Sequence, residues 1–111
     1  MKKLNKDLKR ERRVILKAFC LFTTYSMYKY NASTIDEIVD GIIKDYYNNN
    51  TVRERQQTSI HITSLLNSGV LNICLFLNLI TEQGPTSFNL TDKGKELATK
   101  YDILSNNASA S

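Results

Sequence analysis

The side chains best suited to hydrogen-bonding chemistry lie together between Arg53 and Thr58, in the run Arg-Glu-Arg-Gln-Gln-Thr, which contains no apolar residue. Arg and Gln carry planar heads that pair with guanine and adenine edges in the major groove of DNA, and Thr contacts a base or a thymine methyl group. The alternative is a solvated helix face without a ligand. The neighbouring segments have to decide between these two interpretations.

This polar run opens a predicted helix whose second half is apolar. Thr51 and Glu54 match the S/T-x-x-E capping box, which satisfies free N–H groups at a helix start. Gly69 is expected to end the helix in the left-handed conformation, after which the chain re-enters the core. The polar half would then project from the body. The apolar positions, spaced by three and four, are Ile62, Leu65 and Leu66.

Positive charge is concentrated at the N-terminus. Residues 1–17 contain eight Lys or Arg side chains and two acidic ones, a net charge of +6, whereas the whole chain carries +4, so the remaining 94 residues carry −2. Such a segment suits a phosphate backbone or another anionic surface, and a solubilising tail is the alternative. We therefore treat residues 1–13 as a basic N-terminal arm or helix extension.

The bulk composition predicts one soluble, globular domain in a chain of 111 residues. The sequence has no run of 18 apolar residues, and its basic start is not followed by an apolar block, so we expect neither a membrane span nor a signal peptide. Cys20 and Cys74 share no motif spacing. We expect them to be buried free thiols in a cytoplasmic protein, with a bridge between them as the alternative.

Two further helices precede the polar run. Apolar periodicity predicts a first helix from Asn5 to about Tyr28, with a charged beginning that projects or frays. Thr34 and Glu37 form a second capping box, and the second helix is expected over residues 35–47. Asn48-Asn49-Asn50 then forms a short turn into the third helix. This order is the layout of a helix-turn-helix.

After residue 71 the periodicity changes. Alternating residues between 72 and 80 predict a strand, and residues 87–90 predict a return strand, so that the two form a β-hairpin of about 20 residues. Thr91 is expected to cap a last helix over residues 92–104, and residues 105–111 are expected to be a disordered tail. The first strand is apolar on both faces, which indicates a surface for a partner, expected to be a second copy of the chain.

Two segments carry a family resemblance. Residues 65–71, LLNSGVL, resemble the L-x-x-x-G-[LVI]-[LI] close of a recognition helix in the winged helix-turn-helix superfamily. Residues 88–97, FNLTDKGKEL, are similar to the y-x-L-T-x-x-G-x-x-L step from the wing into the last helix of MarR- and PadR-type regulators. The resemblance covers residues 14–104. It implies a mainly α fold with a small β-hairpin (α+β), and a small, usually dimeric DNA-binding protein.

The expected function follows from the polar run, the basic arm and this resemblance. We expect a sequence-specific double-stranded DNA-binding homodimer that represses transcription. The alternatives are a plasmid or phage centromere-binding partition adaptor and a winged helix used for protein–protein interaction. The predicted wing, residues 81–87, contains no Lys or Arg, so it offers DNA no basic side chain. The expected DNA contacts are Thr51, Arg53, Arg55, Gln56, Gln57, Thr58, His61, Ser64, Lys9, Arg10, Arg12 and Arg13.

The sequence contains no recognisable catalytic arrangement, so we do not expect an enzyme or a cofactor. His61 is the only histidine, and it has no carboxylate or cysteine at metal-ligand spacing. Neither a phosphate-binding loop nor a dinucleotide fingerprint is present.

Overall fold

The computed structural model describes the backbone of residues 2–47 and 51–110 and the side chains of residues 9–47 and 51–104. The fold is mainly helical with one two-stranded antiparallel hairpin, in agreement with the expected α+β class. The expected turn at 48–50 lies outside the described residues. In chain order the elements are α1 (Lys2–Tyr30), α2 (Ile35–Tyr46), α3 (Val52–Leu65), the π-helical turn η1 (Leu66–Val70), α4 (Leu71–Phe76), β1 (Ile80–Glu82), β2 (Phe88–Leu90) and α5 (Asp92–Ala110).

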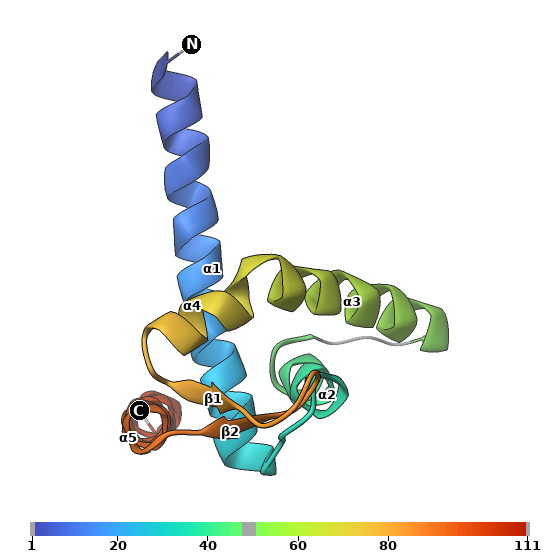
Figure 1. Ribbon diagram of the computed structural model, residues 1–111, viewed down its shortest axis with the longest axis vertical. Coiled ribbons are helices and arrows are strands. Elements are labelled where there is room, and N and C mark those ends of the chain that lie inside the picture. The colour runs from blue at the N-terminus through green and yellow to red at the C-terminus, as the bar shows by residue number, and fades with distance from the viewer. Residues whose placement is uncertain (1, 48–50, 111) are drawn as a thin grey trace.

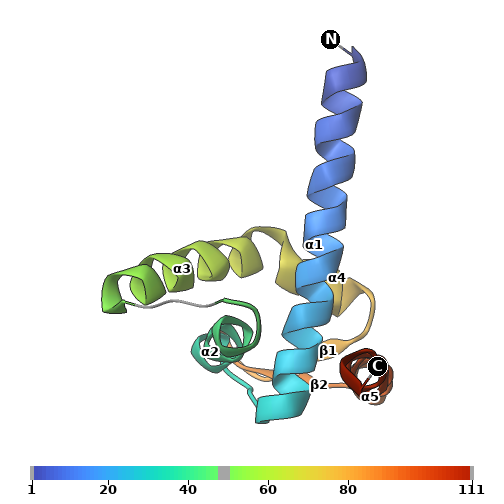
Figure 2. The ribbon, with the colours of Figure 1, turned by 180° about the vertical axis from the view of Figure 1, so that it is seen from behind.

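Helix α1 is the axis of the molecule. Its C-terminal half is surrounded by α2, α4 and α5, while its N-terminal half rises out of the body (Figures 1 and 2). Burial follows this division, because Thr23, Thr24 and Ser26 are fully buried whereas Val14 is 62% exposed. Charged residues dominate the first thirteen positions of the chain, and this explains why the start of the helix stands free of the core. The described helix begins at Lys2 and ends at Tyr30, slightly longer than expected.

Helix α2 begins and ends close to the expected positions. Both hydrogen bonds of the Thr34–Glu37 capping box are present. The pKa of the Glu37 carboxylate is lowered by the hydrogen bonds it accepts, first from the Thr34 hydroxyl and then from backbone N–H groups of Thr34 and Ser33. The helix crosses α1 at Gly41, where a Cβ atom would lie 2.1 Å from the Ser26 Oγ atom. Ser26 donates a hydrogen bond of 2.9 Å to the carbonyl oxygen of Ile38. A glycine is therefore required by the closeness of the two helices.

The third helix does not end where the sequence predicted. Helix α3 continues through η1 into α4, and Gly69 has no left-handed conformation. The predicted strand over residues 72–80 is also wrong, because residues 71–76 are helical. The apolar run fits both periods, and a short run of this kind does not distinguish them. Burial favours the helix, since its core residues recur at helical spacing: Leu66, Val70, Leu71 and Cys74.

The left-handed residue that ends this long helix is Asn78, whose φ angle is 60°. The N–H of Leu79 donates to the Cys74 carbonyl oxygen at 2.9 Å, and the N–H of Asn78 donates to the Leu75 carbonyl oxygen at 3.0 Å. This pair of bonds is a Schellman motif. The helix end predicted at Gly69 therefore occurs nine residues later.

The hairpin is correspondingly short. Ile80 pairs with Leu90 and Glu82 with Phe88, so each strand has three residues and the long first strand predicted from the sequence is not formed. Its turn is fastened to the start of α2, because the N–H of Ile35 donates to the Thr86 carbonyl oxygen at 3.2 Å and the N–H of Phe88 donates to the Ser33 carbonyl oxygen at 2.7 Å. A turn held in this way does not project from the body as an extended wing would.

Helix α5 starts at the expected residue. The hydroxyl of Thr91 accepts a hydrogen bond of 3.0 Å from the N–H of Gly94 and donates one of 2.6 Å to the Asn78 carbonyl oxygen. The helix bounds extend to Ala110, beyond the expected Leu104. The disordered tail stays a prediction, because side chains beyond residue 104 lie outside the described part.

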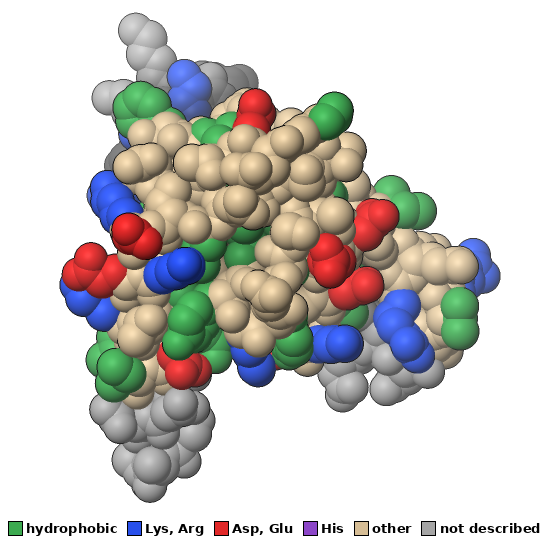
Figure 3. Space-filling model, turned by 60° about the horizontal axis from the view of Figure 1, so that its bottom comes forward, with side chains coloured by type: hydrophobic (Ala, Val, Ile, Leu, Met, Phe, Trp, Pro, Cys, Tyr) green, Lys and Arg blue, Asp and Glu red, His purple; other side chains and the backbone are tan. Residues whose placement is uncertain are grey.

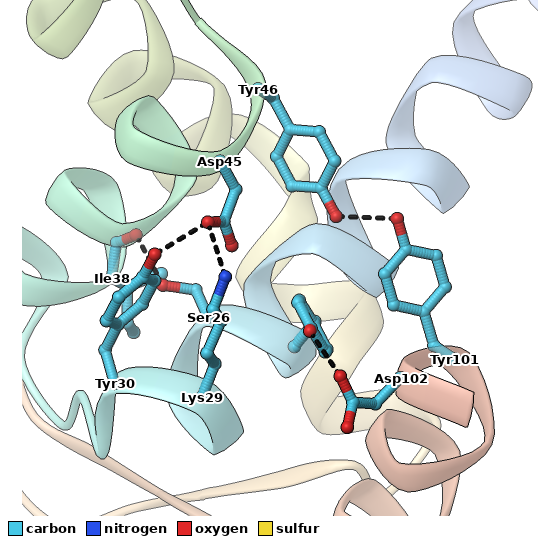
Figure 4. Close-up of polar contacts among 9 residues, drawn as sticks. Ser26, Lys29, Tyr30, Ile38, Asp45, Tyr46, Tyr101 and Asp102 are labelled. Carbon is cyan, nitrogen blue, oxygen red and sulfur yellow. Dashed lines mark hydrogen bonds and ion pairs between the residues drawn. The ribbon is translucent and has the colours of Figure 1, made fainter. Parts of the chain in front are cut away.

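Tyrosine hydroxyls connect α1 to α2 and α5 (Figure 4). Tyr25 donates to Asp102 at 2.7 Å, which raises the pKa of Tyr25 to about 12. Tyr46 and Tyr101 share a hydrogen bond of 2.7 Å, and burial together with this bond raises the pKa of Tyr46. A third contact joins α1 to α2: Lys29 and Tyr30 both donate to Asp45, at 3.0 and 2.6 Å.

Candidate nucleic-acid interface

The outer face of α3 is a strip of polar side chains. Residues separated by four, four and three positions share one face of a helix, and the four side chains at this spacing are all exposed. Ile62, on another face of the same helix, is fully buried against the core. Charge, amide, imidazole and hydroxyl groups therefore lie along one accessible line. We name these residues the outer strip: Arg53, Gln57, His61 and Ser64.

Two predicted contact residues lie elsewhere on α3. Arg55 and Gln56 line a groove of about 660 Å³ between α3 and α2, beside Ile43. They are exposed, but they face the side of the helix that points toward α2. The structure thus separates the neighbouring glutamines, placing Gln57 on the outer strip and Gln56 in the groove.

The two predicted threonines are tied to the helix. The Thr51 hydroxyl accepts a hydrogen bond of 3.1 Å from the N–H of Glu54, so it caps the helix. Thr58 is half-buried. Neither belongs to the outer strip.

The basic arm presents its cations at helical spacing. Lys9 and Arg13 are four residues apart and exposed, and Lys17 continues the same line one turn later. Lys17 was absent from the predicted contact residues, although its spacing from Arg13 could have revealed it. Arg10 and Arg12 are also exposed and lie on either side of this line.

The arm and α3 border one concave corner. A hollow of about 370 Å³ lies at their junction. It is lined by Glu11, Arg12, Ile15 and Leu16 from α1 and by Leu65 and Ser68 from the end of α3 and η1. Figure 1 shows α1 rising from this junction and α3 running sideways from it, with α2 on the side of α3 away from the arm. The outer strip lies on the face of α3 opposite the buried Ile62, and the end of α3 meets the base of the arm through Leu65 and Ser68.

The opposite side of the molecule has a different character. Figure 3 views the face of α2, the hairpin and α5, where blue and red side chains are interspersed and no continuous basic area appears among the coloured residues. The hairpin turn contributes Glu82 and no Lys or Arg. The concentration of cations is therefore on the arm.

A metal centre finds no support in the described part of the chain, where no three side chains of His, Cys, Asp or Glu lie together in a way that could hold an ion. His61 is exposed on the outer strip.

One helical stretch, Val52–Phe76, is long and apolar enough to cross a membrane by length and composition alone. In its most apolar window 28% is buried, including core residues such as Ile62 and Val70. Core helices of soluble proteins meet the same criterion, so the expected cytoplasmic location stays a prediction.

Comparisons with known proteins add no family to this description: no protein-family model, curated protein or solved structure matches the chain. The candidate site therefore depends on its own geometry and chemistry.

Proposed function

We propose that this chain is a winged helix-turn-helix protein that binds double-stranded DNA as a homodimer and represses transcription. The observation that carries the proposal is the outer strip, in which Arg53 and Gln57 are exposed on the face of α3 that lies opposite the core. A helix whose polar N-terminal half is exposed while its other end is anchored suits insertion into a major groove. Bidentate pairing of Arg with guanine and of Gln with adenine would supply the specificity.

The arm completes the proposed interface. A duplex lying in the corner would receive α3 in its major groove, while the arm runs along its phosphates. The helical residues 2–13 of the arm extend about 18 Å, which is enough to follow several phosphates of one strand. Lys9, Arg13 and Lys17 lie on one line of that helix. Phosphate contacts of this kind add affinity without sequence information.

The hairpin has a secondary role in this proposal. Its turn is hydrogen-bonded to the start of α2 and lacks basic side chains. The proposed function therefore does not require the hairpin to contact bases. It differs in this from winged proteins whose wing inserts a basic side chain into the minor groove.

The experiment is a mobility-shift titration with the DNA that flanks the chain's own gene and with a scrambled duplex of equal length. We expect one flanking fragment to bind more tightly than the scrambled duplex. Binding to the flanking and the scrambled DNA should both weaken as the salt concentration is raised. Absence of binding to every duplex at low salt would contradict the proposal.

A protein-interaction function is favoured by one specific observation. Val52 and Ile60 are 67% and 71% exposed and line the groove between α2 and α3, where a partner helix could cover them. Replacement of Ile60 by Ser separates the two functions. If the titration fails for the wild type and Ile60→Ser abolishes capture of a protein from the host cell, the interaction function replaces the DNA function.

A further inference from the structure

The two cysteines meet in the core although they lie 54 positions apart in the chain. The Sγ atom of Cys20 in α1 is 2.8 Å from the Sγ atom of Cys74 in α4, and both are free thiols. Their exposed fractions are 3% and 0%. Since sulfur atoms in a disulfide are about 2.05 Å apart, a bond requires an approach of less than about 1 Å.

We infer that Cys20 and Cys74 form a reversible dithiol–disulfide pair that fastens α1 to α4 within the native fold when it is oxidised. Each sulfur already faces its partner, so closure requires no exchange of secondary structure. The inference is independent of DNA binding. The disulfide would nevertheless join the two elements of the candidate interface. Cys20 lies in α1, which carries the arm, and Cys74 lies in α4, which continues from α3 and its outer strip through η1.

The surroundings assign different roles to the two sulfurs. The contact between the two sulfurs lowers the pKa of Cys20, while the same contact and burial raise the pKa of Cys74. Thiolates are the nucleophiles in thiol oxidation. Cys20, which alone of the two keeps some exposure to an oxidant, is therefore the sulfur that reacts first, and Cys74 resolves the product.

A hydroperoxide is a sufficient oxidant. The Cys20 thiolate attacks one oxygen of hydrogen peroxide, the O–O bond breaks, and the products are a sulfenic acid and hydroxide, which takes up a proton to give water. The Cys74 sulfur, losing its proton, then attacks the Cys20 sulfur. The S–S bond forms, the S–O bond breaks and a second water leaves. Two thiols thus lose two electrons and two protons, and the peroxide is reduced to two waters.

The disulfide would stabilise the fold because it closes a long loop in the unfolded chain. It would also limit relative movement of α1 and α4 at the base of the corner. Both consequences are measurable on the intact chain without replacing any residue.

The test treats the folded wild type with hydrogen peroxide and measures intact mass, alkylation after denaturation, and thermal unfolding. The expected product is a single chain, not disulfide-linked to another, that is lighter by two hydrogens and has no alkylatable thiol. Its thermal unfolding midpoint should rise by roughly 10 °C or more. Dithiothreitol should reverse all three changes. The variants Cys20→Ala and Cys74→Ala serve as controls, and neither should gain stability on oxidation.

Three results would overturn the inference. The first is a folded protein that keeps two alkylatable thiols after treatment with peroxide. The second is oxidation that yields only sulfinic or sulfonic acids or disulfides between molecules. The third is an intramolecular disulfide that leaves the midpoint unchanged or lowers it, since the native fold would then not accommodate the bond.

Discussion

At the scale of single residues, the proposed function raises the question of which side of α3 would contact the bases. The spacing of four between Arg53 and Gln57 predicts that they share one helical face, but it does not say which way that face points. Burial and the groove separate the four side chains, because Arg53 and Gln57 share the outer strip while Arg55 and Gln56 line the groove toward α2. The chain thus offers one Arg and one Gln on each face, which makes a matched comparison possible.

We predict that Arg53→Ala and Gln57→Ala lose specific DNA binding, whereas Arg55→Ala and Gln56→Ala largely retain it. Each bidentate pair is worth about 1–3 kcal/mol of discrimination against the wrong base. All four side chains are exposed, so the free energy of unfolding should change little. A competition assay of specific against scrambled duplex measures the effect. Equal effects from both faces would show that the outer strip is not the reading face.

We predict opposite effects on the free energy of unfolding when Gly94 and Gly69 are each replaced by Ala. A Cβ atom at Gly94 would lie 2.2 Å from the Leu79 carbonyl oxygen, so Gly94→Ala should destabilise the fold by about 1–3 kcal/mol. At Gly69 the nearest atom would be a Leu16 methyl at 3.6 Å. Gly69→Ala should therefore stabilise the helix, by up to about 1 kcal/mol.

Urea unfolding of both variants measures the difference. Destabilisation by Gly69→Ala would favour a left-handed conformation of this glycine at a helix end, as its sequence context suggests, since an added Cβ is unfavourable there.

The raised pKa of Tyr25 predicts that the free energy of unfolding falls at high pH. Its pKa is raised to about 12 by the hydrogen bond to Asp102, against an ordinary value of about 10 in the unfolded chain. The contribution of the protonated Tyr25 hydroxyl to the free energy of unfolding is therefore complete below about pH 10, and it is lost as the pH rises toward 12. Tyr25→Phe should make this decline shallower, because Tyr46 and Tyr30, whose pKa values are also raised, continue to contribute.

Chemical unfolding measured between about pH 8 and pH 12 tests this, since that range spans the ordinary tyrosine pKa. The control is Tyr28→Phe, because Tyr28 is 41% exposed and its hydroxyl has no hydrogen-bond partner within the described residues. The idea fails if both variants keep the full pH dependence of the wild type.

At the scale of elements, the exposed N-terminal half of α1 carries the positive charge that would attract DNA in the proposed function. We predict that Lys9→Gln with Arg13→Gln weakens binding to specific and scrambled duplexes alike. Gln preserves helix propensity while removing charge. For each phosphate that the arm no longer neutralises, the slope of the log–log salt dependence should flatten by about 0.9.

Lys93→Gln with Lys95→Gln on α5 is the matched control, because these two lysines are exposed outside the corner. An arm that only solubilises the protein would show no difference between the two double variants. Removal of the residues before Arg12 should have a larger effect in the same direction.

At the scale of the whole molecule, exposed apolar side chains indicate a second copy. Phe76 is 88% exposed at the end of α4, Val14 is 62% exposed on α1 directly after the arm, and Leu104 is 68% exposed on α5. We predict a homodimer, with a light-scattering mass of twice the 12.7 kDa of one chain. Phe76→Gln and Val14→Gln, tested separately, identify which surface is buried. A wild-type mass of 12.7 kDa at every concentration would rule out the dimer.

The sequence alone determined the features that depend on local chemistry. Both capping boxes, the starts of α2, α3 and α5 and the mainly helical class follow from hydrogen bonds and periodicities within a few residues. The exposure of Arg53 and Gln57 likewise follows from the absence of apolar side chains near them. These features require no knowledge of what lies on the other side of the core.

Tertiary structure decided the features in which local signals conflict. Residues 70–76 fit a helix or a strand, and burial of Val70, Leu71 and Cys74 against α1 selects the helix, which moves the left-handed residue to Asn78. The same packing shortened the hairpin. It also brought Cys20 to Cys74 and the base of the arm to the end of α3, because contacts between residues far apart in the chain are set by how apolar faces are buried together.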